Sequence, residues 1–238
     1  MFDINKQIYV GDELHLFEKA VNWKKYYANL ISPYLSGRVL EVGAGLGGTT
    51  KILCDGTQTD WLCLEPDRHL CSDIEKMLLA GELPHYCRVQ NTTIDAIPTD
   101  EKFDAIIYID VIEHIENAEE ELQKAVNHLK SGGYIGIIVP AFQSLFSPFD
   151  KAIGHFRRYD KKQLIQSMPS GMTQTTLRYL DSVGAVASLT NKFFLKQSYP
   201  TAQQIQMWDS NIVPISMFID PLIGFSCGKS LLGVWQKD

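Results

Sequence analysis

The sequence predicts an α/β fold in which a mainly parallel sheet is covered by helices on both faces. Segments with the apolar pattern of buried strands alternate with segments of helical periodicity along most of the chain. A cluster of glycines, VGAGLGG, directly follows the first of these strands. In sheets of this kind a ligand binds beyond the carboxyl ends of the strands, so we expect the functional site near the glycines.

Composition narrows the class of protein. The chain has 238 residues, of which 45% are hydrophobic, enough for one well-buried α/β domain. A net charge of -6 provides no basic field for nucleic acid. The five cysteines lack any CxxC spacing, which indicates reduced thiols in place of disulfides. We find no signal peptide and no apolar run of about 18 residues, and therefore expect a cytoplasmic protein without a transmembrane segment. We expect the protein to be a monomer or a homodimer.

The elements of the first half follow from their patterns. Apolar residues recur at helical spacing from residue 13 until Pro33, where the helix should end. Apolar runs indicate strands at 38–43, 60–66 and 86–90, and the segments between them are expected to be helices at 47–56 and 69–83.

The second half continues the alternation of strands and helices. An apolar strand is expected at 103–111, followed by a helix at 118–133 with glycine at its end and a strand at 134–140. A helix at 161–168 and strands at 173–181 and 229–237 complete the expected elements.

The glycine cluster admits more than one ligand. Gly43, Gly45 and Gly48 satisfy GxGxxG, and Glu65 follows about 20 residues later, as in nicotinamide dinucleotide sites; a purely structural glycine turn is the alternative. Glu41 distinguishes between the ligands. A carboxylate two residues before the loop would repel a pyrophosphate but would suit an ammonium or sulfonium charge, which favours S-adenosylmethionine.

Four segments in order, VLEVGAGLGGTT, CLEPD, FDAIIYIDVIEHI and LKSGGYIGIIVP, resemble the class I S-adenosylmethionine-dependent methyltransferases over roughly residues 37–140. The later stretch LFSPFDKAIGHFRRYDKKQL is similar to a small-molecule branch, methyltransferase type 11 or 12. The resemblance implies a doubly wound, Rossmann-like sheet of seven strands with an antiparallel last strand. It also implies a single domain over 1–238, with a helical cap at 1–36, a cofactor-binding core at 37–140, and a substrate-side half at 141–238 that carries a helical insertion at about 182–228.

The resemblance also implies which residues bind the cofactor. Those expected at its methionine end are Glu41, Gly43, Ala44 and Gly45. Glu65 is expected to accept the ribose hydroxyls, and Pro66 to flank the adenine. After the third strand, where many relatives carry an acid, this chain has Thr92 and Thr93 with Asp95 two places late, so backbone contacts around the threonines are expected. Asp110 and Val111 are expected to face the methionine end or the substrate.

Candidate catalytic residues follow the fourth strand. Asp110 either contacts the cofactor or substrate or caps the next turn. His114 either accepts the proton that a hydroxyl or amine loses on methylation, or only shapes the pocket. Glu113 is expected to be a structural hydrogen-bond partner. We expect no metal site, because no set of possible ligands has a recognisable spacing and His114 and His155 belong to separate segments.

Acceptor binding is expected after the fifth strand. The donors gathered there are His155, Arg157, Arg158 and Tyr159. They suit an anionic acceptor with an apolar body. The alternatives are a solvated basic patch, or an arginine paired internally with Asp150 or Asp160. The insertion could pack on the core, cover the pocket, contact a second copy or contact a lipid-like acceptor.

The sequence thus predicts methyl transfer from S-adenosylmethionine, with S-adenosylhomocysteine as product, to oxygen or nitrogen of a small-molecule or conjugated acceptor. One alternative is a binding protein that keeps the cofactor site without catalysis, acting as a sensor or partner subunit. A nicotinamide-dependent oxidoreductase is disfavoured by Glu41 and by the lack of a recognisable Tyr-x-x-x-Lys pair beyond the fifth strand.

Overall fold

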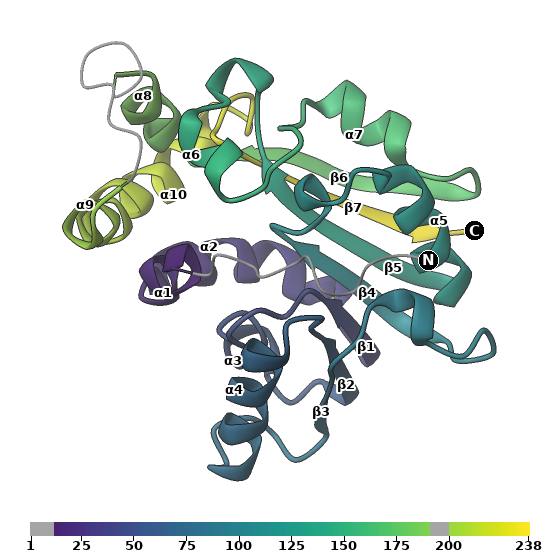
Figure 1. Cartoon of the computed structure of the whole chain (residues 1–238). Helices are drawn as coiled ribbons and strands as arrows, with labels where there is room; N and C mark the ends of the chain where they lie inside the picture. Colours follow the sequence, from purple (N-terminus) through teal and green to yellow (C-terminus); the bar gives the residue numbers. More distant parts are fainter. Residues whose placement is uncertain (1–11, 191–199) are drawn as a thin grey trace.

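A seven-stranded sheet forms the centre of the protein, as Figure 1 shows for the computed structural model. The structure describes residues 12–190 and 200–238, so the start of the expected cap and part of the expected insertion lie outside the described residues. The strands are β1 (Gly37–Val42), β2 (Gln58–Leu64), β3 (Cys87–Gln90), β4 (Phe103–Ile109), β5 (Leu129–Pro140), β6 (Met172–Leu180) and β7 (Ser230–Lys237).

The strand order is β3-β2-β1-β4-β5-β7-β6. Strand β7 runs antiparallel to both of its neighbours, β5 and β6. The remaining pairs in the sheet are parallel. The topology confirms the predicted doubly wound sheet with an antiparallel last strand.

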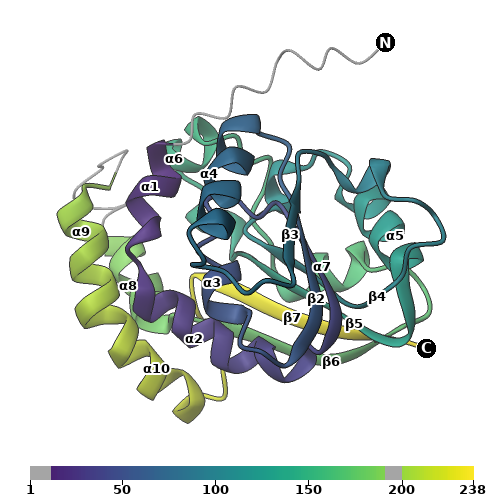
Figure 2. The ribbon, with the colours of Figure 1, turned by 90° about the horizontal axis from the view of Figure 1, so that it is seen from below.

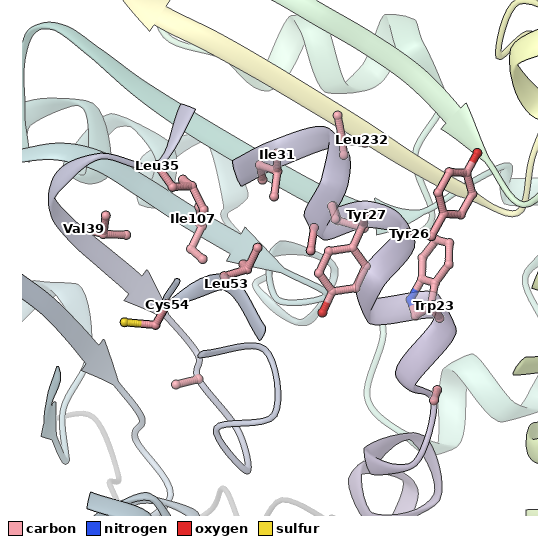
Figure 3. Close-up of a cluster of buried hydrophobic side chains, with 14 of the residues drawn as sticks. Trp23, Tyr26, Tyr27, Ile31, Leu35, Val39, Leu53, Cys54, Ile107 and Leu232 are labelled. Carbon is pink, nitrogen blue, oxygen red and sulfur yellow. The ribbon is translucent and has the colours of Figure 1, made fainter. Parts of the chain in front are cut away.

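Helices cover both faces of the sheet, each over its own apolar cluster. One cluster includes side chains of α2 (Val21–Ile31), α3 (Thr50–Leu53) and α4 (Arg68–Leu79). The other includes side chains of α5 (Ala118–His128) and α7 (Lys161–Ser167). Figure 3 shows the first cluster, in which Tyr27 and Ile31 of α2 lie among side chains of the sheet such as Ile107 and Leu232. Two-sided burial explains why the strands are nearly continuous apolar runs.

Two boundaries differ from the sequence-based expectation. The single helix expected from residue 13 is divided into α1 (Asp12–Glu18) and α2, because Ala20 leaves the helical region with ψ 69°. The helix expected at 118–133 ends at His128, and its glycines belong to β5. Leu129 already pairs with Phe103 of β4, so the residues before Tyr134 bulge within the strand.

The insertion between β6 and β7 is helical, as expected, over its described residues. It contains α8 (Ser182–Thr190), α9 (Ala202–Met207), the π-helical turn η6 (Trp208–Ile212) and α10 (Val213–Leu222). Figure 2 shows these helices beside α1 and α2. The buried side chains of Ile205, Trp208 and Val213 belong to the same apolar cluster as α2, so this part of the insertion packs on the core.

Buried aspartates join the insertion to the rest of the chain. Asp209 accepts hydrogen bonds from the backbone N–H groups of Asn22 (3.1 Å) and Trp23 (2.9 Å), and so caps the start of α2. Asp220 accepts from the Tyr26 hydroxyl at 2.7 Å and from the backbone N–H of Asp181 at 2.7 Å. These bonds satisfy donors that would otherwise be buried without a partner.

No helix among the described residues combines the length and the apolar character that spanning a membrane requires.

The contacts of Asp220 predict a strong dependence of stability on this residue. Asp220→Asn replaces an acceptor oxygen by an amino group facing N–H and O–H donors, and should lower the free energy of unfolding by about 2–3 kcal/mol. Urea denaturation measures the effect, with Asp100→Asn as the exposed control. Equal stability of the two variants would contradict the anchoring role of Asp220.

Candidate functional site

The carboxyl ends of the parallel strands bring the expected site residues to one edge of the sheet. Val42, near the end of β1, pairs with Leu64 of β2 and with Tyr108 of β4. The glycine loop, Glu65 and Asp110 follow these three strand ends directly. They therefore lie together although they are far apart in the sequence.

The glycine loop is shaped by one close approach. Gly43 has φ 72°, and a Cβ at this position would lie 2.6 Å from Cγ2 of Val111, so only glycine fits. The N–H groups of Gly43 and Ala44 both donate to the carbonyl of Leu64, at 2.8 and 3.1 Å. The loop is therefore held between the end of β2 and the residue after Asp110.

Glu65 links the glycine loop to the end of β2. One carboxylate oxygen accepts the N–H of Gly45 at 2.7 Å, and the other accepts the N–H of Asp67 at 2.9 Å. Burial raises the pKa of Glu65, although these two backbone donors oppose the shift. The residue expected to bind a ribose thus also fixes the position of Gly45.

Glu41 is buried beneath the loop on the α2 face of the sheet. Its Oε2 accepts hydrogen bonds from the Thr50 hydroxyl at 2.6 Å and from the Trp61 indole N–H at 2.9 Å. Burial raises the pKa of Glu41 to about 7, against the effect of these donors. Neither Thr50 nor Trp61 was identified from the sequence. Both lie on the same side of the sheet as the Glu41 side chain. The alternation of side chains between the two faces of β2 could have indicated Trp61.

Asp110 directly follows the last residue of β4. Its backbone has φ 54°, in the left-handed region, and its N–H donates to the carbonyl of Ile138. The residue is open to solvent, but the surrounding protein removes enough water to raise its pKa to about 6. The positive charges of His155 and Lys229 oppose that shift. The next turn, η3 (Ile112–His114), receives no side-chain cap, so the structure shows no capping role for Asp110.

Helix α1 lies over the glycine loop. A Cβ on Gly45 would lie 3.7 Å from a methyl group of Leu14. The ammonium group of Lys24 donates to the carbonyls of Phe17 and Glu18, both at 2.8 Å, which satisfies the end of α1. Sequence reasoning identified neither Leu14 nor Lys24 as part of this site, because α1 and the loop meet only in the folded chain.

The polar residues after β3 follow the same edge of the sheet as Glu65. Thr92 and Thr93 follow β3 at the same edge of the sheet, next to Glu65. The Asn91 side chain donates to the carbonyls of Glu65 and Pro66, both at 2.9 Å, and so supports the end of β2. Asp95 instead pairs with Lys124 of α5 at 2.8 Å.

Two segments meet beside Asp110. The imidazole rings of His114 and His155 are 4.5 Å apart in an edge-on arrangement. Glu113 is fully buried, and its Oε1 lies 3.9 Å from Nε2 of His155. The sequence-based expectation of no metal site rested on the separation of the two histidines, and the fold removes that ground.

Arg158 and His155 both contact Asp150 of α6 (Pro148–Ala152). Arg158 donates two hydrogen bonds to the Asp150 carboxylate, at 2.8 and 3.0 Å, and His155 Nδ1 lies 3.0 Å from the same group. Burial alone would raise the pKa of Asp150, but the hydrogen bonds from His155 and Arg158 hold it well below its usual value. The internal pairing of an arginine with Asp150, one of the sequence-based alternatives, is therefore present.

The other two expected acceptor residues differ in exposure. The Arg157 guanidinium donates to the carbonyl of Glu116 and lies near the ring of Phe156, which is 51% exposed. Tyr159 is buried in the cluster beneath α5 and α7, and burial raises its pKa to about 12. Its location does not favour direct contact with an acceptor.

Residues 40–135 match a family model described as a methyltransferase domain. This part of the chain is therefore a methyltransferase domain. No curated protein sequence matches this methyltransferase.

Solved structures show the same fold at low sequence identity. An S-adenosylmethionine-dependent methyltransferase from Clostridium acetobutylicum has a TM-score of 0.60 and 10% identity, over 95% of this chain and 98% of the other. Geranyl diphosphate methyltransferase bound to S-adenosylmethionine has a TM-score of 0.65 and 10% identity, over 99% and 94%. The [4+2]-cyclase SpnF has a TM-score of 0.62 and 14% identity, over 96% and 95%.

The match to a methyltransferase domain decides between the cofactors considered from the sequence. The methyl donor of this methyltransferase is S-adenosylmethionine, so its GxGxxG pattern does not mark a nicotinamide site.

The contacts of Arg158 predict a structural effect of its removal. Arg158→Ala leaves the buried Asp150 carboxylate without its main partner and should lower the free energy of unfolding by about 3 kcal/mol. Arg157→Ala removes a half-buried neighbour that pairs with no buried carboxylate, and should change it by less than about 0.5 kcal/mol. Thermal and urea unfolding of both variants test this. If Arg158→Ala keeps wild-type stability but raises the KM of an acceptor, Arg158 binds the acceptor instead.

Proposed function

We propose that this methyltransferase transfers the methyl group to an oxygen or nitrogen atom of a small-molecule acceptor. The observation that carries this proposal is the position of three carboxyl groups, those of Glu41, Glu65 and Asp110, around one glycine loop. Desolvation by the surrounding protein raises the pKa of all three, although Asp110 is itself exposed. A ligand with sulfonium and ammonium charges would stabilise their ionised forms, whereas a pyrophosphate would be repelled.

In this proposal, the residues at the ends of β1, β2 and β3 each bind a different part of the cofactor. Glu41 and the loop Gly43–Gly45 hold the methionine end, with Val111 packed against the loop. Glu65 accepts the ribose hydroxyls. Each oxygen of its carboxylate already accepts one N–H, but a carboxylate oxygen can accept a second hydrogen bond. Pro66, Thr92 and Thr93 contribute the adenine side of the site.

The rate of methyl transfer depends mainly on how the acceptor atom is positioned relative to the methyl group. The cofactor supplies a methyl group on a good leaving group, and an acceptor atom held in line with it can react without further activation. Asp110 lies where it can orient the methionine end or the acceptor. Burial lowers the pKa of His114 to about 4, so its imidazole is neutral at pH 7 but a weak base, which favours a role in shaping the pocket over proton transfer.

The acceptor in this proposal has an anionic group and an apolar body. Arg157 and the exposed ring of Phe156 lie next to each other on the segment after α6, with the guanidinium 5.8 Å from the ring centre. Such a pair can bind an anion and an apolar surface at once. Geranyl diphosphate, named as the substrate of one protein with this fold, combines the same two features.

The proposal is tested by separating binding from turnover. Calorimetry with S-adenosylmethionine, S-adenosylhomocysteine and NAD should detect binding of the first two only. A panel of isoprenoid phosphates, acidic lipids and amines with labelled methyl donor then detects transfer. Binding of NAD alone would overturn the cofactor site, and binding without transfer to any acceptor would favour the sensor or partner-subunit alternative.

Glu65 should control cofactor affinity. Glu65→Ala removes a charged acceptor of the ribose hydroxyls and should weaken S-adenosylhomocysteine binding by roughly 1.5–3 kcal/mol. Glu75→Ala, an exposed residue on α4, is the matched control and should bind normally. Calorimetry gives both dissociation constants, and unchanged affinity in Glu65→Ala would refute this role.

Glu41 should make stability depend on pH. Its pKa is raised from 4.5 to about 7 in the folded protein, so the folded state holds a proton that the unfolded state loses. Stability of the free protein should therefore fall as pH rises from about 4.5 to 7, by up to about 3 kcal/mol, and less in Glu41→Gln. Urea unfolding at pH 5 and pH 8 measures the difference. The same pH slope in both proteins would contradict the assignment.

A further inference from the structure

We propose that Glu113, His114 and His155 bind a divalent transition-metal cation beside the acceptor side of the pocket. Each of these residues offers one ligand atom, and the three atoms lie within 4.8 Å of one another. Two imidazole nitrogens and one carboxylate oxygen form a donor set that suits zinc, iron(II) and similar ions better than magnesium or calcium.

The buried carboxylate of Glu113 is the observation that points to a ligand. The residue has no exposed surface, and among the described residues neither of its carboxylate oxygens has a hydrogen-bond partner. A buried acid without a partner is costly, whether it is charged or neutral. A cation between Glu113 and the two histidines would satisfy it.

The histidines are oriented as ligands usually are. His155 directs Nδ1 to Asp150 at 3.0 Å, which leaves Nε2 on the side of Glu113. His114 makes a hydrogen bond with the backbone of Ile153. Metal-binding histidines typically place their second nitrogen against a carboxylate or a carbonyl, which fixes the tautomer and the ring.

The two segments of the site are held together independently of any ion. The N–H of Phe156 donates to the carbonyl of Glu113 at 2.8 Å, next to His155. Arg158 fixes Asp150 through two hydrogen bonds, and Asp150 in turn holds His155. The 3.9 Å between Glu113 and His155 exceeds the separation of about 3.3 Å implied by tetrahedral ligands at about 2.0 Å, so small side-chain rotations complete the site.

Three protein ligands leave a coordination position for water or for an oxygen of the acceptor. Cation binding itself does not depend on methyl transfer. The further role, in which the cation attracts an anionic acceptor or favours loss of its proton, rests on the proposed function.

Metal titration of the whole chain tests the site. The Cys227→Ser background removes the exposed thiol, and chelator dialysis followed by gel filtration removes bound ions. We expect one equivalent of Zn²⁺ by calorimetry, and a Co²⁺ absorption spectrum typical of a site with nitrogen and oxygen ligands. Glu113→Gln and His155→Ala should weaken both by at least tenfold, and His69→Ala, at an exposed histidine, should not.

Asp150→Asn is a further variant that keeps all three ligands and should weaken Zn²⁺ binding about tenfold through the orientation of His155. If His155→Ala does not fold, Glu113→Gln and Asp150→Asn still decide the test. Absence of stoichiometric Zn²⁺ and Co²⁺ binding, or equal affinity in wild type and Glu113→Gln, would overturn the proposal. S-adenosylhomocysteine affinity measured on the same samples separates this failure from failure of the cofactor site.

Discussion

The functional edge of this methyltransferase depends on the contact between Gly43 and Val111. The glycine backbone approaches the valine so closely that no side chain fits between them. This contact holds the loop after β1 against the turn after β4. As a result, the acids at the ends of β1, β2 and β4 lie at one edge of the sheet, where desolvation disfavours their charged forms. A positively charged ligand is the natural complement of such a region.

The insertion before β7 is fixed to the rest of the fold by buried hydrogen bonds. Asp209 and Asp220 of the insertion accept hydrogen bonds from backbone N–H groups and from a hydroxyl group of α2 and of the turn after β6. These bonds hold the described helices of the insertion on the α2 face of the sheet. Asp181 adds bonds to the Trp208 indole at 2.7 Å and the Ser216 hydroxyl at 2.6 Å. Polar bonds therefore set the location of these helices, and apolar burial supplies much of the packing.

The segment that contains His155 and Arg158 is organised around Asp150. This aspartate connects Arg158 to His155, and His155 faces Glu113, so a chain of charged and titratable groups extends from α6 to the turn after β4. This arrangement explains why a segment rich in basic residues can be mostly structural. In the same segment Phe156 is exposed and Arg157 is half-buried, and neither side chain contacts Asp150 in the hydrogen bonds described above.

The sequence alone determined the strand and helix alternation, the glycine loop and the acids at the ends of β1 and β2, because these depend on local patterns of period and spacing. It could not decide the break between α1 and α2, since Asp209, which caps α2, comes from the distant insertion. Nor could it tell whether Arg158 binds an acceptor or Asp150, or that His114 and His155 meet. These outcomes depend on side chains from separate segments, and only the tertiary structure brings those segments into contact.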